Sequence, residues 1–233
     1  MNQESPQKEK SIKAMVTDID GSLTDDKRRI SMDAIFALRE LEKKEIPVML
    51  ASGNVLPIAY GLASFIGISG PVISENGGVV YHEGEVRYLA DRKKCDIAFE
   101  TLRKQLPVKK IFTDIWRKAE VAIYPDVDLE EVKKFVSDFN LKAETTGFAI
   151  HIFEPQVSKF QGLLFACDLL DIQVKDVVAF GDSENDIDMI KNCGIGLAPS
   201  NATTELKSHA DFIASNPDGL GLVEGLRWLG LLD

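Results

Sequence analysis

The sequence has little of several things that point to particular classes of protein. It holds 3 cysteines in 233 residues, and the positions of Cys95, Cys167 and Cys193 form no CxxC pair. Neither a disulfide framework nor a thiolate zinc site is therefore predicted, and we expect buried, reduced thiols. Long apolar runs are also missing, because no segment approaches the roughly 20 apolar residues that span a bilayer. No membrane partner is expected.

Basic charge is scarce as well. The chain has 27 Lys and Arg against 37 Asp and Glu, a formal net charge of −10. Nucleic-acid binding depends mostly on Lys and Arg, so no nucleic-acid partner is expected. An anionic substrate is not excluded, because a metal ion and a few donors can reverse the potential inside one cleft. Residues 1–10 are polar and lack the apolar core of a signal peptide, which predicts a cytoplasmic protein.

Histidine is equally rare, with 3 residues and no HExxH pattern. We expect packing or surface roles for them. His151 lies in the apolar run 148–153 and is the candidate to face a cleft.

Apolar strand patterns and amphipathic helix patterns alternate along most of the chain. Strands are expected at residues 12–17, 47–51, 71–74, 177–180, 195–198 and 212–214. Helices are expected from Ser31, at 56–66, from Ser158, from about Asn185 and around 220–229. This alternation predicts an α/β fold, a Rossmann-like parallel sheet with helices on both faces.

The pattern changes after Gly84. Amphipathic strands at 85–89, 121–124 and 148–153 and a helix at 128–139 indicate a separate, smaller unit. We interpret residues 84–155 as an inserted α+β domain, and residues 1–83 and 156–233 as the core.

Two acidic motifs follow predicted strands. Asp18 and Asp20 come directly after the strand at 12–17, and the carboxyl ends of strands are where open α/β sheets place their sites. An Asx-rich turn is the alternative, whereas an EF-hand is excluded because Gly21 directly follows Asp20. Asp182 and Asp186 follow the strand at 177–180 and can converge on a hard cation such as Mg²⁺. The alternative is an acidic helix N-terminus, which the helix dipole favours.

Two weaker signals lie between these motifs. Ser52, Gly53 and Asn54 follow a predicted strand and precede a helix, so a hydroxyl and backbone N–H groups are available to a phosphate. Lys159 can supply a cation. Taken singly, such a turn is common and an isolated Lys is usually a solvated surface charge.

In this order the four motifs resemble those of the haloacid dehalogenase superfamily. The Gly21-Ser22 form, the turn at 75–78 and the Gly181 to Asp186 loop resemble its Cof-type branch. The short insertion and the form of residues 52–54 are most similar to the archaeal-type phosphoglycolate phosphatases. Two departures are Ser22 in place of the commoner Thr, and Phe160 after Lys159 where Gly is frequent.

The resemblance implies an Mg²⁺-dependent phosphatase that hydrolyses small phosphate monoesters, most of all 2-phosphoglycolate, through a phospho-aspartate on Asp18. It implies Asp20 as general acid and base, and the inserted domain as a cap over the site. The implied metal ligands are Asp18, the Asp20 backbone carbonyl, Asp182 and Asp186. The implied substrate-binding residues are Ser52, Gly53, Asn54, Lys159 and Asn185.

Its expected partner is a small phosphorylated metabolite, and the chain is expected to be a monomer or homodimer. The alternatives are a phosphosugar phosphatase or phosphomutase of the same superfamily, or a catalytically silent metal-binding protein.

Overall fold

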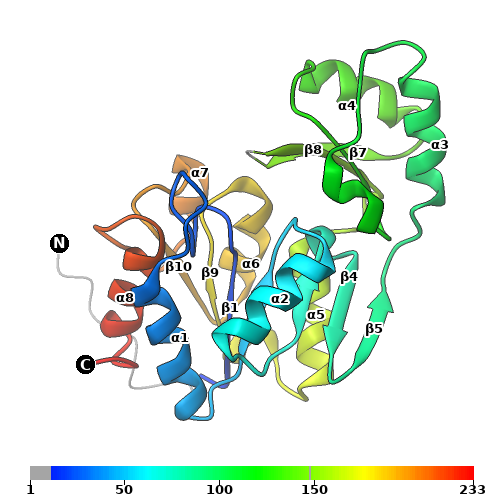
Figure 1. The fold of residues 1–233 in the computed structure, drawn as a ribbon. Coiled ribbons are helices and arrows are strands. Elements are labelled where there is room, and N and C mark those ends of the chain that lie inside the picture. The colour runs from blue at the N-terminus through cyan, green and yellow to red at the C-terminus, as the bar shows by residue number, and fades with distance from the viewer. Residues whose placement is uncertain (1–11, 147) are drawn as a thin grey trace.

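The computed structural model describes residues 12–146 and 148–233, which form two β-sheets with helices packed on them (Figure 1). The polar segment at residues 1–10, which lacks the apolar core of a signal peptide, lies outside the described residues. The larger sheet has eight strands and the smaller has three. Within the described ranges, no helix has the length and apolar character needed to cross a membrane.

The larger sheet is mostly parallel, which confirms the predicted Rossmann-like core. Its strands, in order across the sheet, are β11 (Phe212–Ile213), β10 (Ile195–Ala198), β9 (Val177–Phe180), β1 (Ala14–Thr17), β2 (Val48–Ala51), β3 (Val72–Ser74), β4 (Val79–His82) and β5 (Glu85–Tyr88). The first six of these pair in parallel, and β4 and β5 add an antiparallel edge.

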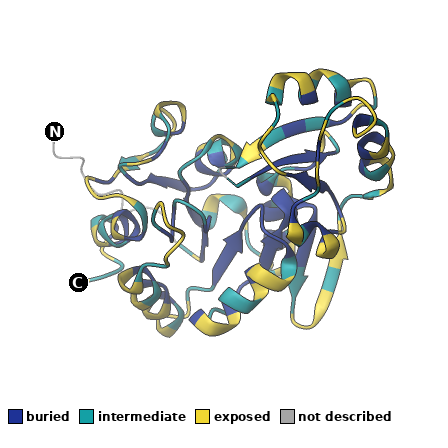
Figure 2. Cartoon of the chain, turned by 45° about the horizontal axis from the view of Figure 1, so that its top comes forward, coloured by how far each residue is buried: buried dark blue, intermediate teal, exposed yellow. Residues whose placement is uncertain are grey.

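Helices cover both faces of this sheet. One face carries α1 (Met32–Lys43), α2 (Leu56–Ile66) and α8 (Asp218–Trp228), and the other carries α5 (Lys159–Leu169), α6 (Ile187–Asn192) and α7 (Thr204–Lys207). Successive strand residues point to opposite faces, so Met15 of β1 packs in the first layer and Val16 in the second. Figure 2 shows the strands buried between helices whose outer sides are exposed. Burial on both sides explains why these strands are continuous apolar runs.

Local capping explains two of the predicted helix starts. Ser31 precedes α1 and its Oγ accepts a hydrogen bond from the backbone N–H of Ala34 at 3.3 Å. Ser158 precedes α5 and accepts from the N–H of Gln161 at 3.2 Å. Each bond satisfies a donor that the first turn would otherwise leave unpaired. Short 3₁₀ helices also occur in the larger unit, namely η1 (Glu75–Gly77), η3 (Val174–Asp176) and η4 (Glu184–Asp186).

The smaller sheet is antiparallel, with strand order β6 (Val121–Ile123), β8 (Ala149–Phe153), β7 (Lys142–Thr146). Helices α3 (Lys93–Leu102) and α4 (Leu129–Ser137) share a buried apolar cluster with its strands, and η2 (Phe112–Trp116) precedes β6. The elements predicted at 121–124, 128–139 and 148–153 are thereby confirmed. The sequence patterns did not predict β4, α3, α7 or β7.

One strand belongs to a different sheet from the one expected. The strand predicted at 85–89 forms as β5, but it pairs with β4 in the larger sheet. The boundary placed at residue 84 therefore assigns to the insertion a strand of the core sheet. The reason is local, because Glu83 and Gly84 both have positive φ, 47° and 86°. Such a turn sends the chain directly back along the preceding strand.

Candidate active site

The predicted site residues gather where the central strands of the larger sheet end. Strand β1 pairs in parallel with both β9 and β2, so the carboxyl ends of the three strands lie side by side. Asp18 follows β1, Asp182 follows β9 after Gly181, and Ser52 follows β2. Residues far apart in the sequence are in this way brought to one edge of the sheet.

A cluster of three carboxylates forms the centre of the site. Asp18, Asp182 and Asp186 each offer an oxygen, and these oxygens lie within 4.8 Å of one another. Lys159, at the start of α5, lies between two of them, with Nζ 2.6 Å from Asp18 Oδ1 and 2.8 Å from Asp186 Oδ1. Its side chain is buried, so Lys159 is not the solvated surface charge of the alternative interpretation.

The cluster has more negative than positive charge. Burial, followed by the charge of Asp186, raises the pKa of Asp182 to about 7. Burial also raises the pKa of Asp18; Lys159 opposes this rise, while Asp186 and Asp182 add to it. Burial alone would lower the pKa of Lys159, but the charges of Asp18 and Asp186 raise it. Three carboxylates facing one ammonium form an all-oxygen donor set with excess negative charge, which suits a hard divalent cation.

The loops hold these carboxylates in fixed positions. Asp186 Oδ2 accepts hydrogen bonds from the backbone N–H groups of Asp182 and Ser183, both at 3.2 Å. Asp182 Oδ1 accepts from Ser22 Oγ at 2.8 Å. Gly21 has φ +84° and a Cβ there would lie 2.5 Å from Asp182 Oδ2. Only glycine combines that backbone conformation with so close an approach.

Asp20 lies apart from the carboxylate cluster. Its Oδ2 accepts a hydrogen bond from Asn54 Nδ2 at 2.5 Å, and its Oδ1 pairs with Arg28 Nε at 2.8 Å. Asn54 also donates to Ser52 Oγ from its backbone N at 3.0 Å and from Nδ2 at 3.1 Å. Because a hydroxyl can accept and donate at once, Ser52 keeps its O–H for a ligand.

A cavity of about 360 Å³ opens at this point between the two sheets. The residues lining it that the sequence predicted are Asp18, Asp20, Gly53, Lys159, Asp182 and Asn185. Those that the sequence did not predict include Arg28 from the loop after β1 and Thr145, Thr146 and Phe148 from the smaller unit. Ser52, Asn54 and Asp186 lie behind this lining in the same hydrogen-bond network.

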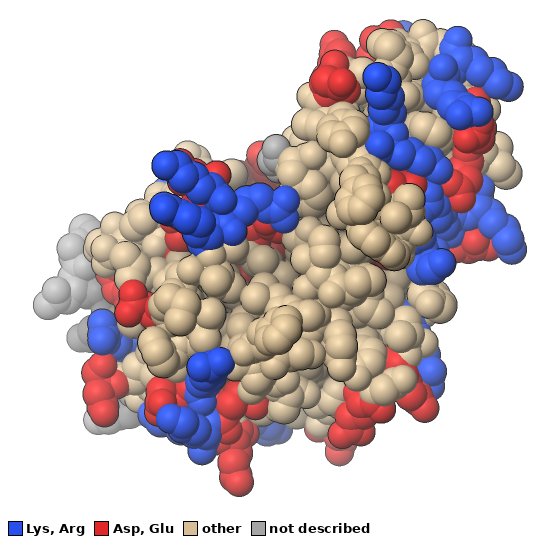
Figure 3. Space-filling model, viewed as in Figure 1, with Lys and Arg blue, Asp and Glu red and all other residues tan. Residues whose placement is uncertain are grey.

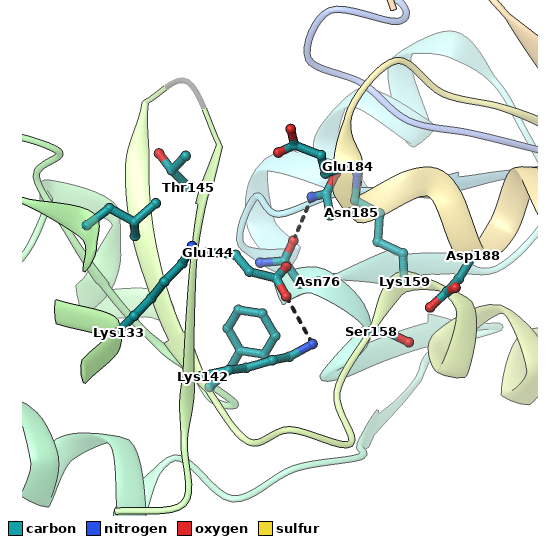
Figure 4. Close-up of a pocket in the computed structure, with 12 residues that line it drawn as sticks. Asn76, Lys133, Lys142, Glu144, Thr145, Ser158, Lys159, Glu184, Asn185 and Asp188 are labelled. Atoms are coloured by element: carbon teal, nitrogen blue, oxygen red, sulfur yellow. Dashed lines mark hydrogen bonds and ion pairs between the residues drawn. The ribbon is translucent and has the colours of Figure 1, made fainter. Parts of the chain in front are cut away.

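A second cavity of about 270 Å³ adjoins the first (Figure 4). From the smaller unit, Lys142 and Glu144 line it and form an ion pair at 3.1 Å. From the larger unit, Asn185 Nδ2 donates to Asn76 Oδ1 at 3.2 Å. The two cavities share Thr145, Lys159 and Asn185. Among the described lining residues, Asp18 and Asp20 line only the larger cavity, so that cavity is the one where chemistry can occur.

Polar contacts attach the smaller unit to the larger one. The carboxylate of Glu75 in η1 accepts hydrogen bonds from the backbone N–H groups of Lys118, at 2.9 and 3.0 Å, and Ala119, at 2.8 Å. Arg117 Nη1 donates to the backbone carbonyl of Gly53 at 3.0 Å. The segment before β6 therefore contacts the same turn that carries Ser52 and Asn54.

His151 belongs to a buried network at this junction. Its Nδ1 lies 2.7 Å from Glu120 Oε1 and its Nε2 lies 2.8 Å from Thr146 Oγ1. Glu120 also pairs with Arg117 and accepts from Asn76 Nδ2 at 2.9 Å. Burial would raise the pKa of Glu120, but the charges of His151 and Arg117 lower it. His151 is fully buried, so it does not face the cavity as hypothesised but holds Thr146, which does.

The remaining cavity residues carry little signal in the sequence. Arg28 lies in a run of charged residues at 25–29, which is typical of a solvated turn, and Thr146 lies on a strand that was not predicted. The cysteines match expectation, since all three are free and buried.

Comparison with known proteins agrees with this geometry. The sequence matches the family described as haloacid dehalogenase-like hydrolase over residues 15–108 and 89–226. A phosphoglycolate phosphatase of Archaeoglobus fulgidus is 43% identical over 94% of this chain and 98% of that protein. One of Methanothermobacter thermautotrophicus is 40% identical over 93% of this chain and 98% of that protein.

A solved structure shows the same architecture. The crystal structure of Thermoplasma acidophilum 0175 superposes with a TM-score of 0.91, at 29% identity over 95% of this chain and 99% of that one. The chain belongs to the haloacid dehalogenase-like hydrolase family. It is an enzyme of that family, with a carboxylate cluster able to hold a divalent cation.

Proposed function

We propose that the protein is an Mg²⁺-dependent phosphatase that hydrolyses small phosphate monoesters, with 2-phosphoglycolate as its substrate. The observation that carries this proposal is the position of Asp18, which lines a cavity of about 360 Å³ and accepts a hydrogen bond from Lys159. The carboxylates of Asp182 and Asp186 lie beside it. Cations offset the charge of a dianionic phosphoryl group, and a carboxylate can act as the nucleophile that accepts it. The phosphoglycolate phosphatases at 40% and 43% identity support the choice of substrate.

In the proposed mechanism Asp18 attacks phosphorus in line, and the bond between phosphorus and the ester oxygen breaks. Asp20 gives its proton to the leaving alkoxide, and Asp18 then carries an acyl phosphate. Asp20 next takes a proton from water as the water attacks phosphorus, which releases inorganic phosphate and frees Asp18. The exposure of the Asp20 side chain, 25% against 4% for Asp18, supports a role in exchanging protons with substrate and water.

The other residues hold the phosphoryl group and the metal. Ser52, the backbone of Gly53 and Asn54, and Lys159 would bind phosphoryl oxygens, with Asn185 at the cavity wall. Asp18, the Asp20 carbonyl, Asp182 and Asp186 would hold Mg²⁺, whose charge offsets the repulsion between the carboxylates and the phosphate.

We also propose that the smaller unit acts as a cap. Its residues Thr145, Thr146 and Phe148 line the cavity opposite Asp18 and Asp20, so they limit the size of the leaving group. Covering the site excludes bulk water from the acyl phosphate. Our predictions of a cytoplasmic location and of a monomer or homodimer remain predictions.

Release of inorganic phosphate from a panel of monoesters tests the proposal. The panel holds 2-phosphoglycolate, a hexose phosphate and p-nitrophenyl phosphate, each with Mg²⁺ and after removal of metal by EDTA. We expect the largest kcat/KM for 2-phosphoglycolate and loss of turnover on chelation, restored by added Mg²⁺. A preference for the hexose phosphate would contradict 2-phosphoglycolate as the substrate and favour a phosphosugar phosphatase. Accumulation of a phosphorylated sugar in place of phosphate would indicate a phosphomutase. Turnover that survives exhaustive chelation would contradict the proposed dependence on Mg²⁺.

A further inference from the structure

Arg28 is a charged residue of the cavity to which the proposed reaction assigns no role. It lies in the turn between Thr24 and Ile30, which form an isolated β-bridge, and its backbone is left-handed with φ 57°. Its side chain is 51% exposed and lines the cavity beside Asp18 and Asp20.

Three contacts direct the guanidinium into the cavity. Its Nε lies 2.8 Å from Asp20 Oδ1, and its Nη2 lies 3.4 Å from Asn54 Oδ1. Its Cζ lies 4.7 Å from the centroid of the Phe148 ring, which belongs to the cap. Stacking on an aromatic face and pairing with a carboxylate hold the fork in one plane. A guanidinium has five N–H donors, so these contacts leave donors for a ligand.

The charged residues that line the cavity indicate where an anionic leaving group can bind. Its described lining holds five carboxylates, Asp18, Asp20, Asp25, Asp26 and Asp182, and two cations, Arg28 and Lys159. Lys159 is buried on Asp18 and Asp186. With Lys159 and the proposed Mg²⁺ assigned to the phosphoryl group, Arg28 is the remaining cation of the described lining that can attract a further negative charge on the substrate.

The structure of the leaving group also limits how far its carboxylate can lie from the ester oxygen. In a 2-phosphoglycolate molecule the carboxylate carbon is separated from the ester oxygen by one methylene group. Asp20 must reach the ester oxygen in order to protonate it, so whatever binds the carboxylate must lie next to Asp20. Arg28 is in direct contact with Asp20. Lys133 and Lys142 of the cap line the other cavity.

We propose that Arg28 determines specificity by binding the carboxylate of the leaving group, in a bidentate pair made as the guanidinium turns from Asp20 towards the substrate. The inference rests on the proposed function and extends it to a substrate class, short 2-phosphorylated hydroxy acids. Arg suits this role because its fork matches the two oxygens of a carboxylate. Phe148 of the cap then covers the pair from the other side.

The test compares two esters of equal length, 2-phosphoglycolate and 2-hydroxyethyl phosphate, which carries a hydroxymethyl group where the first has a carboxylate. Wild-type protein is expected to prefer 2-phosphoglycolate. In R28M the ratio of the two kcat/KM values should fall by about 10- to 100-fold, the range for a charged hydrogen bond. Arg28 also contacts Asp20, so its loss lowers kcat/KM for both esters through Asp20. The ratio of the two kcat/KM values cancels this shared effect and reports the contact with the carboxylate. The change in ratio should arise mainly from KM, because the carboxylate takes no part in the reaction.

K142M is the matched control, since Lys142 is a cap cation of the other cavity, and it should keep the wild-type ratio. R28K should recover part of the ratio, because Lys keeps the charge and loses the fork. A wild-type preference that survives in R28M, or that K142M removes, would overturn the role of Arg28 and leave the proposed function standing. A wild-type protein that hydrolyses both esters equally well would overturn the proposed substrate and the carboxylate site together.

Discussion

Two carboxylates two residues apart in the chain lie in different surroundings. The side chain of Asp18 is buried and bonded to Lys159, whereas that of Asp20 is 25% exposed and contacts Arg28 and Asn54. Residues two apart on an extended chain would point to the same side, but β1 ends at Thr17 and the chain bends at Ile19 and turns over residues 20–23, which separates the two side chains. These surroundings suit the tasks proposed for the two residues. Asp18 is fixed within the carboxylate cluster, whereas Asp20 is accessible to a leaving group and to water.

The first prediction separates these tasks with Asp20→Asn. The variant keeps the nucleophile, but it loses a proton donor worth about 10²- to 10⁴-fold. For an alkyl ester such as 2-phosphoglycolate we expect a loss of that size. For p-nitrophenyl phosphate the loss in kcat/KM, which reports formation of the phospho-aspartate, should be much smaller, because the phenolate leaves without a proton. Since Asp20 is also proposed to activate water, acid-quenched reactions of this second ester should contain trapped phospho-aspartate.

Asp18→Asn is the control for this prediction. It removes the nucleophile and should abolish turnover and covalent labelling with both esters. Equal losses with both esters in Asp20→Asn, without trapped intermediate, would contradict the assignment of Asp20.

At the scale of elements, η1 provides contacts that link the smaller unit to the larger one. Glu75, Asn76 and Gly77 have consecutive positive φ values of 50°, 54° and 100°, and a Cβ on Gly77 would lie 1.9 Å from the backbone oxygen of Ser158. This unusual backbone turns the Glu75 carboxylate towards the N–H groups of Lys118 and Ala119. The same turn presents Asn76 to Glu120 and Asn185.

The second prediction concerns the pH dependence that Glu75 contributes. Burial, with a smaller effect of Glu120, raises its pKa from 4.5 to about 7. Between these values the folded protein binds more protons than the unfolded chain. The free energy of unfolding therefore falls as the pH rises from about 4.5 to 7 and is level above. We expect Glu75 to contribute a decline of about 3 kcal/mol.

Urea unfolding of wild type and Glu75→Gln from pH 5 to 8 measures this decline. The difference between the two proteins isolates Glu75, because Asp182 titrates in the same window in both. Glu40→Gln is the control, since Glu40 lies on the surface in a pair with Lys43, and it should keep the wild-type pH dependence. Parallel curves for wild type and Glu75→Gln would show that Glu75 does not titrate in this way.

At the scale of the whole molecule, the carboxylate cluster brings together residues from the first and the later part of the larger unit. Asp18 follows β1, whereas Asp182 and Asp186 lie in the segment after β9. On the face shown in Figure 3, Lys and Arg side chains are interspersed with Asp and Glu over both units. On this face acidic and basic side chains are mixed, whereas the described lining of the cavity holds five carboxylates and two cations.

The third prediction concerns metal-linked stability. Mg²⁺ binds the folded cluster and not the dispersed carboxylates of the unfolded chain, so it should raise the free energy of unfolding by about 2.7 kcal/mol at 100 times Kd. Asp182→Asn should instead be stabilised in the absence of metal. Without metal at pH 8 its Tm should exceed that of wild type by about 2–4 °C or more, the shift for 1 kcal/mol in a chain of this size. The reason is that a repelled charge, whose pKa is raised to about 7, has been removed.

Thermal denaturation of both proteins with Mg²⁺ and with EDTA measures these effects. In Asp182→Asn the increase with Mg²⁺ should be largely lost. Asp188→Asn provides a nearby acidic control, because Asp188 lies in α6 outside the carboxylate cluster, and it should keep the increase. A full Mg²⁺ effect in Asp182→Asn would contradict the metal assignment.

What the sequence determined by itself is local. Apolar runs, Ser caps and acidic motifs depend on neighbouring residues, so the core strands, the capped helices and the positions of Asp18 and Asp182 could be read from the chain. The strand at 85–89 was assigned to the wrong unit because an amphipathic pattern shows that a strand has one buried face and not which sheet it joins.

Tertiary structure alone decided which residues meet. The order β9, β1, β2 brings Asp182, Asp18 and Ser52 together, and no local pattern specifies it. The place of Lys159 in the site was implied only by the family resemblance, and its burial against Asp18 and Asp186 excludes the alternative of a solvated surface charge. Arg28 and Thr146 line the cavity because the smaller unit packs against the larger one. Arg28 lies in a charged turn, and Thr146 is hydrogen-bonded to His151. Such contacts depend on the distance between side chains in space, which separation along the chain does not determine.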